Sequence, residues 1–154
     1  MQLPLTSGCP CGALRYEVTE APLTLYTCHC TKCQRMSSSA FQMSMPVRRT
    51  AFRVTAGTPR GWTYRTGAGS DSTSWFCPDC AGRIYGENTR RPAVVVVRAG
   101  SLDDTKWLAP IGHLWTHSAQ PWQHFDDGTL CYATQPGDNA DLLAAWRNRV
   151  ARQD

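Results

Sequence analysis

Cys28-His29-Cys30-Thr31-Lys32-Cys33 is the middle one of three cysteine clusters that decide how this chain folds. The other two are Cys9-Pro10-Cys11 and Cys77-Pro78-Asp79-Cys80, so the clusters together hold seven of the eight cysteines. Thiolates separated by one or two residues can converge on a single ion, with zinc–sulfur distances of about 2.3 Å. A structural zinc site takes four such ligands, whereas a catalytic site keeps one position open. The seven cysteines therefore divide naturally into a group of four and a group of three.

Disulfide bonding is the first alternative, because an even number of cysteines is typical of short secreted chains. Residues 1–7 lack the basic and apolar regions of a signal peptide, and a Cys-x-Cys pair fits the geometry of an internal disulfide poorly. The longest strongly apolar run, residues 93–97, is too short to cross a bilayer. We therefore expect a cytoplasmic protein that holds metal through thiolates and has no membrane partner.

Length and composition fit one globular domain spanning residues 1–154. A hydrophobic content of 42% and six tryptophans can supply a core, so zinc would supplement packing rather than replace it. The net charge of +4 comes from scattered arginines and not from a basic run, which argues against a nucleic-acid partner.

Short alternating segments predict a mainly β fold with antiparallel pairing. Leu14, Tyr16 and Val18 recur at every second position directly after the first cluster, as in a half-buried strand. Turn residues separate this segment from similar ones further along the chain. The additional strands are expected at residues 23–27, 40–46, 51–55, 62–66, 73–76, 83–86 and 93–99.

Two helices are expected. A C-terminal helix follows Asp138 or Asn139, either of which can cap it, and its apolar side chains recur at helical spacing from Leu142 to Val150. A single-turn helix is expected to begin at Thr31, a candidate N-cap inside the middle cluster.

The first and third clusters predict a closed structural site made of Cys9, Cys11, Cys77 and Cys80. Each pair occupies a tight turn that enters a strand, and Gly12 relieves the sharp backbone after Cys11. Joining the two turns closes a long loop, so the free energy of metal binding becomes folding free energy.

The middle cluster predicts a second metal site, with Cys28, Cys30 and Cys33 as its ligands. Three thiolates leave one position on zinc, which water or a substrate thiol can take and where a thiol would be deprotonated. Such a thiolate beside an aldehyde is arranged to form a hemithioacetal. Alternatively, Cys131 or a histidine completes a closed site, although Cys131 has no turn partner and His29 should point away from the ligands.

Four segments resemble the glutathione-dependent formaldehyde-activating enzyme (GFA) family, which includes the centromere protein V domain. They are Gly8-Cys-Pro-Cys-Gly-Ala-Leu-Arg-Tyr-Glu-Val18, Cys28-His-Cys-Thr-Lys-Cys-Gln-Arg-Met-Ser-Ser-Ser-Ala-Phe41, Phe76-Cys-Pro-Asp-Cys80 and His113-Leu-Trp-Thr-His-Ser-Ala-Gln-Pro-Trp122. The resemblance implies an Mss4-like, zinc-containing β fold (a β-tent) with two zinc ions per chain. The structural zinc would lie at Cys9, Cys11, Cys77 and Cys80, and the zinc of the active centre at Cys28, Cys30 and Cys33.

The activity implied by the resemblance is the joining of glutathione and formaldehyde into S-(hydroxymethyl)glutathione, a carbon–sulfur lyase reaction run in reverse. Its partners would be a small-molecule thiol and an aldehyde. Arg35 and Ser38 are candidates for the thiol pocket, and Arg48 and Arg49 are further candidates for binding a glutathione carboxylate.

Two positions depart from the family pattern, because Ser38 and Ala81 stand where the family usually has glycine. A non-glycine residue in a left-handed turn costs about 1–2 kcal/mol. We therefore expect a rearranged turn at Ala81, and we expect Ser38 to affect the choice of substrate.

Two other functions are compatible with the sequence. The first is an Mss4-like binding module that is stabilised by zinc and has no catalytic activity. The second is a B-type methionine sulfoxide reductase, which shares the fold. The residues after Cys131, Tyr132-Ala133-Thr134, do not match the flanking motif of a reactive cysteine in such a reductase.

Overall fold

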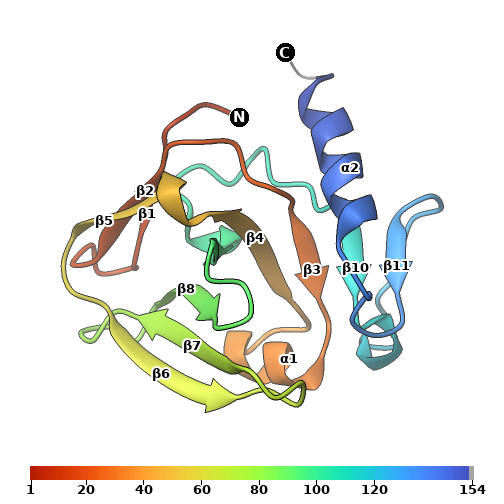
Figure 1. The fold of residues 1–154 in the computed structure, drawn as a ribbon, viewed down its shortest axis with the longest axis horizontal. Coiled ribbons are helices and arrows are strands. Elements are labelled where there is room, and N and C mark those ends of the chain that lie inside the picture. Colours follow the sequence, from red (N-terminus) through yellow and green to blue (C-terminus); the bar gives the residue numbers. More distant parts are fainter. Residues whose placement is uncertain (153–154) are drawn as a thin grey trace. The chain divides into compact units, whose positions relative to one another are not determined.

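The structure, a computed structural model, describes residues 1–152 and is mainly β (Figure 1). Its strands are β1 (Leu5–Gly8), β2 (Arg15–Val18), β3 (Tyr26–Cys28), β4 (Gln42–Arg48), β5 (Phe52–Ala56), β6 (Arg60–Arg65), β7 (Asp71–Phe76), β8 (Arg83–Asn88), β9 (Val94–Arg98), β10 (Gly112–Leu114) and β11 (Leu130–Tyr132). The α-helices are α1 (Thr31–Ser37) and α2 (Ala140–Val150), and 3-10 turns occupy Arg49–Ala51, Ala99–Ser101 and Thr116–Ser118.

Contacts within the chain divide it into two compact units. Unit 1 comprises Met1–Pro22 and Met45–Trp107, and unit 2 comprises Leu23–Ser44 and the described residues from Leu108 onward. That the whole chain forms one domain remains a prediction.

Unit 1 contains two sets of antiparallel strands. One set has the order β1-β2-β5, and the other runs β9-β8-β7-β6. The alternation read from the sequence holds in β2, where Tyr16 and Val18 are buried in the core. The Tyr16 hydroxyl lies 2.8 Å from the Ser101 hydroxyl, which satisfies its hydrogen-bonding capacity.

Unit 2 is arranged around β10, which pairs in parallel with β3 on one side and with β11 on the other. Helix α2 packs against this strand. A Cβ atom added to Gly112 of β10 would lie 2.6 Å from Cδ2 of Leu142, so only glycine permits this approach. Leu142 joins a buried cluster with Tyr26, Cys28 and Leu114. The core of unit 2 therefore includes one of the cysteines of the middle cluster.

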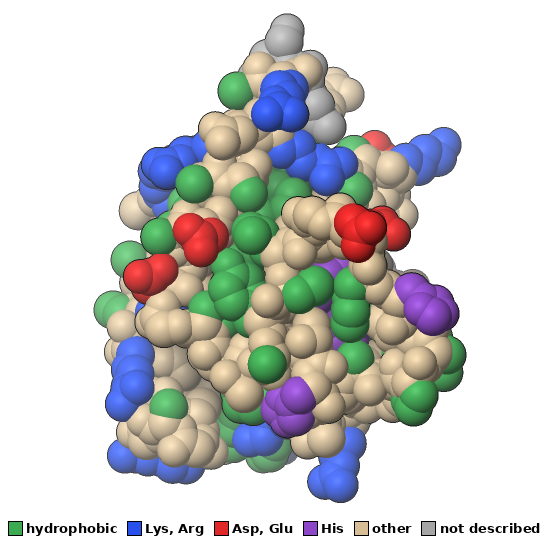
Figure 2. Space-filling model, turned by 90° about the vertical axis from the view of Figure 1, so that its right-hand side faces the viewer, with side chains coloured by type: hydrophobic (Ala, Val, Ile, Leu, Met, Phe, Trp, Pro, Cys, Tyr) green, Lys and Arg blue, Asp and Glu red, His purple; other side chains and the backbone are tan. Residues whose placement is uncertain are grey.

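Helix α2 carries its basic residues where the helix dipole favours them. Arg147 and Arg149 lie in its last turn, and Figure 2 shows Lys and Arg side chains gathered around the C-terminal end of the helix. The Arg149 guanidinium donates a hydrogen bond of 3.1 Å to the carbonyl of Ala109. Neither helix in the described part of the chain is long and apolar enough to span a membrane.

The mainly β fold with a C-terminal helix is confirmed, two details differ from the prediction, and the two cap candidates of α2 are distinguished. Pairing is not antiparallel throughout, because β10 has two parallel neighbours. Helix α1 is capped by Cys30 rather than by Thr31, since the Cys30 sulfur accepts from the Cys33 N–H. Asn139 precedes α2 without a side-chain cap bond, while the Asp138 carboxylate accepts from the Ala140 N–H at 2.9 Å.

Candidate metal centres

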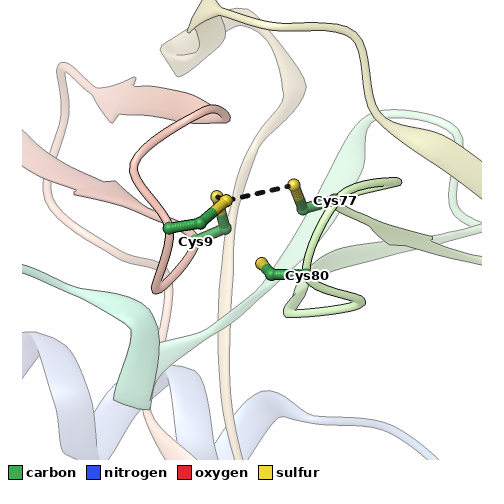
Figure 3. A group of neighbouring side chains, drawn as sticks. Cys9, Cys77 and Cys80 are labelled. Atoms are coloured by element: carbon green, nitrogen blue, oxygen red, sulfur yellow. Dashed lines mark hydrogen bonds between the residues drawn. The ribbon is translucent and has the colours of Figure 1, made fainter.

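The four-cysteine group, Cys9, Cys11, Cys77 and Cys80, lies entirely within unit 1, and its four sulfurs all lie within 4.8 Å of one another. Figure 3 shows Cys9, from the turn after β1, facing Cys77 and Cys80 from the turn after β7. The Cys9 and Cys11 sulfurs are 3.4 Å apart, and those of Cys11 and Cys77 are 3.8 Å apart. Bonds of 2.3 Å from zinc to four sulfurs give tetrahedral edges of about 3.8 Å, so these residues fit such an ion.

Backbone hydrogen bonds shape the first of these turns. The Leu14 N–H donates to the Cys9 sulfur at 3.2 Å, and the Gly12 N–H donates to the Cys9 carbonyl at 3.0 Å. Gly12 has φ of +80°, in agreement with the role expected for it. Burial of Cys9 favours the neutral thiol, but hydrogen bonds from Leu14 and from the other three thiols outweigh it and lower the pKa of Cys9 to about 6. Within this group the thiolate form that binds metal is therefore favoured at Cys9.

The second turn corrects the expectation for Ala81. The knuckle is closed, with the Ala81 N–H donating to the Cys77 carbonyl and the Cys77 N–H donating to the Gly82 carbonyl, both at 2.9 Å. Ala81 takes the left-handed conformation itself, with φ of 58°. The turn thus keeps its geometry, and Ala81 adopts the left-handed conformation despite its unfavourable free energy, instead of the backbone rearranging.

The three-cysteine group, Cys28, Cys30 and Cys33, lies entirely within unit 2, and its sulfurs also lie within 4.8 Å of one another. Cys28 ends β3 and is buried, whereas Cys30 caps α1 and Cys33 lies in its first turn, both partly exposed. The Cys28 and Cys30 sulfurs are 3.6 Å apart, close to the edge of a zinc tetrahedron. Hydrogen bonds from the Cys28 and Cys33 thiols lower the pKa of Cys30. The group can therefore bind a metal ion with one buried and two accessible sulfurs.

Apolar side chains surround the buried side of this group. Cys28 belongs to the core cluster of unit 2, against which Trp115 and Tyr132 also pack. Such surroundings limit access of water to the buried sulfur and strengthen electrostatic interactions there.

The His29 ring is not part of the three-cysteine group, as its position between Cys28 and Cys30 suggests. Its Nε2 lies 3.0 Å from the Thr27 hydroxyl, which in turn lies 2.6 Å from Nδ1 of His113. The ring also contacts Phe41 and Phe125. Burial lowers the pKa of both His29 and His113 and so favours their neutral forms.

The substrate candidates are distributed between the units. Arg35 lies exposed on α1, and Ser38 ends that helix in the left-handed conformation, with φ of 52°. Arg48 and Arg49 lie in unit 1 and form ion pairs with Glu20 at 2.8 Å and with Glu87 at 3.0 Å. Arg35 and Ser38 are thus the candidates that share a unit with the three-cysteine group.

Cys131 is exposed on β11 and belongs to neither of the cysteine groups found among residues 1–152. We expect Cys131→Ser to retain both metal equivalents and the wild-type unfolding temperature. Metal content determined together with thermal unfolding checks this. Loss of one equivalent would show that the second site is closed by a fourth cysteine, which would favour the binding module.

Sequence reasoning missed several polar residues around the three-cysteine group. Thr27 and His113 hold the His29 ring, and Gln34 donates hydrogen bonds to the carbonyls of His29 and Ser118. In the sequence, the position of Gln34 next to Cys33 and one turn after Cys30 could have indicated that it lies near the three-cysteine group.

Two groups of clustered cysteines within a mainly β fold place this chain in the class of candidate metalloproteins. The sequence matches the family described as glutathione-dependent formaldehyde-activating enzyme over residues 4–118. The chain therefore belongs to the GFA family.

A comparison of structures agrees on the fold. A crystal structure of a Rhodobacter sphaeroides protein, solved as a structural genomics target, is similar to this chain with a TM-score of 0.52 and 20% sequence identity. The similarity covers 83% of this chain and 99% of the other. No curated protein matches the sequence.

Proposed function

We propose that this protein is a zinc-dependent enzyme that joins a small thiol to an aldehyde at the three-cysteine group. Glutathione and formaldehyde are the reference substrates, because the family is glutathione-dependent and formaldehyde-activating. The observation that carries the proposal is the convergence of three sulfurs, with no further Cys, His, Asp or Glu in the group among the residues described. Three protein ligands are the number that a catalytic zinc site uses.

The residues of unit 2 suit this reaction. Cys28, Cys30 and Cys33 would hold the zinc ion, and the partial exposure of Cys30 and Cys33 leaves a side on which a small molecule can approach. Zinc, when bound, would supply a Lewis acid that lowers the pKa of a thiol brought to it. The Trp115 and Tyr132 side chains limit access of water from the buried side. In the reaction the thiol sulfur bonds to the aldehyde carbon, and the thiol proton ends on the carbonyl oxygen.

The four-cysteine group is proposed as the structural zinc site of the same enzyme. Its sulfurs form a complete tetrahedral donor set, and Cys9 and Cys77 are buried. We therefore assign it no step in the reaction.

A cobalt titration tests the proposed function. In protein loaded with cobalt, glutathione should change the thiolate charge-transfer bands saturably, and formaldehyde added afterwards should change them again. Cys30→Ala should abolish both responses, whereas Cys131→Ser is the matched control that should keep them. A spectrum that ignores glutathione, cysteine and other small thiols would refute the enzyme and leave the binding module as the better explanation.

A further inference from the structure

The side-chain amide of Gln34 uses all of its hydrogen-bonding groups on two segments near the three-cysteine group. Its Nε2 donates to the His29 carbonyl at 2.6 Å and to the Ser118 carbonyl at 2.7 Å. Its Oε1 accepts from Nε2 of Gln120 at 2.9 Å. Because both carbonyls can only accept, the amide can be oriented in one way only. No other side chain of this length offers two donors and an acceptor in that arrangement.

The first of these bonds acts on the peptide between two metal-ligand candidates. His29 separates Cys28 from Cys30, and its N–H donates to the Leu114 carbonyl at 2.9 Å. Gln34 therefore fixes the carbonyl of a residue whose N–H is fixed by β10. Because both the N–H and the carbonyl of His29 are hydrogen-bonded, the sulfurs of Cys28 and Cys30 stay at their separation of 3.6 Å.

The other two bonds act on residues 115–120. This segment begins at Trp115, which has φ of 61° and packs against the core cluster that contains Cys28. It continues through the 3-10 turn Thr116–Ser118 to Gln120. The Gln34 amide holds the segment at Ser118 and Gln120, beyond the strained Trp115. One side chain thus connects the segment to the loop that carries Cys28 and Cys30.

We propose that Gln34 is a positioning residue, which couples the geometry of the three-cysteine group to the conformation of residues 115–120. Metal at the three cysteines then stabilises the segment, and the segment in turn slows release of the metal. This inference rests on the proposed function only where it concerns thiols, because Trp115 packs against the same core cluster as Cys30 and Cys33, the ligands beside which the thiol would bind.

The test compares Gln34→Glu and Gln34→Met with a matched control, Gln123→Met. Glutamate keeps the shape but places oxygen against two carbonyl oxygens, and methionine keeps the length but loses all three bonds. Among the bonds described, the Gln123 side-chain amide donates only to the carbonyl of the adjacent His124. Loss of this amide should therefore have no effect on metal release or on hydrogen exchange in residues 115–120. Changing residues that hold metal ligands typically costs about 10–100-fold in metal affinity.

Three measurements distinguish positioning from general destabilisation. In both Gln34 variants, a chelator should remove one metal equivalent about tenfold faster or more, while the second equivalent leaves at the wild-type rate. Hydrogen exchange in residues 115–120 should rise in these variants, and Gln120→Leu, which removes one of the three bonds, should show a smaller change of the same sign. In cobalt-loaded protein the concentration of glutathione needed for half of the spectral change should increase.

Several outcomes would overturn the inference. Wild-type metal release from Gln34→Met would do so, as would release of both equivalents at equal, increased rates, which would indicate general destabilisation. If Gln34→Glu does not fold, Gln120→Leu decides, and wild-type exchange in residues 115–120 of that variant refutes the coupling. If wild-type cobalt protein ignores thiols, the proposed function fails, whereas the rates of metal release still test Gln34.

Discussion

Cys77→Ala is expected to remove one metal equivalent and to abolish cooperative unfolding of unit 1. Cys77 is 1% exposed and starts the turn that faces Cys9 (Figure 3), and its sulfur lies 3.8 Å from that of Cys11. Removal of this ligand leaves three sulfurs where a structural site uses four, and the binding free energy lost is folding free energy. Cys33→Ala is the matched variant in the other group. It should also lose one equivalent but remain folded, because unit 2 has its own core around Leu114 and Leu142.

Metal analysis and near-UV circular dichroism of both variants measure this difference. Wild-type protein should contain two equivalents, and each variant should contain one. Equal loss of structure in Cys77→Ala and Cys33→Ala would show that the division into a structural site and a reactive site is wrong. Two retained equivalents in Cys77→Ala would exclude Cys77 as a ligand.

Gly82→Ala is expected to weaken metal binding at the four-cysteine group by at least about tenfold and to destabilise the fold by about 1–3 kcal/mol. A Cβ atom at this position would lie 2.7 Å from Cδ of Pro10, 3.3 Å from the Cys80 sulfur and 3.5 Å from Cβ of Cys9. The Pro10 ring cannot rotate away, because it closes onto its own backbone nitrogen and moves only with the chain between Cys9 and Cys11. The methyl group must therefore push the two metal-binding turns apart.

The adjacent residue supplies a control with the opposite sign. Ala81→Gly relieves a left-handed backbone and should raise stability by up to about 1 kcal/mol, which is the strain less the greater flexibility of glycine in the unfolded chain. Chemical denaturation and competition with a chelator measure both effects. Wild-type metal affinity in Gly82→Ala would show that the turns can separate without moving the sulfurs.

The strands predicted from alternation and turn residues correspond to β2 through β9. The strands that were missed, β1, β10 and β11, are short, and their sequences Leu-Thr-Ser-Gly, Gly-His-Leu and Leu-Cys-Tyr lack the alternation of apolar and polar residues that indicated β2. The parallel pairing of β10 depends on residues distant in the sequence, because His113 pairs with Thr27 on one side and with Cys131 on the other. No local sequence pattern indicates such pairing.

For the candidate sites, the spacing of the cysteines predicted which sulfurs come together, but the sequence did not predict the local backbone conformation around them. Clusters of cysteine separated by one or two residues identified both groups that the fold brings together. The sequence could not show whether alanine at position 81 distorts the turn or accepts strain, because the surrounding hydrogen bonds decide. Nor could it show that the Cys30 sulfur caps α1, since the thiol competes with the hydroxyl of Thr31 for that position.

The Cys11 and Cys77 sulfurs lie 3.8 Å apart, although 66 positions separate the two residues. Closing a loop of that length costs an unfolded chain about 4 kcal/mol, less than the 10 kcal/mol or more that structural zinc typically contributes. Each turn can, however, bind an ion alone as a two-sulfur chelate before the loop closes. At high zinc concentration each turn would then hold its own ion. One of these two ions must dissociate before both cysteine pairs can bind the remaining ion together. If zinc is the metal of this group, as proposed, we therefore expect a large excess of it to slow refolding, which refolding rates measured at increasing zinc concentration would show.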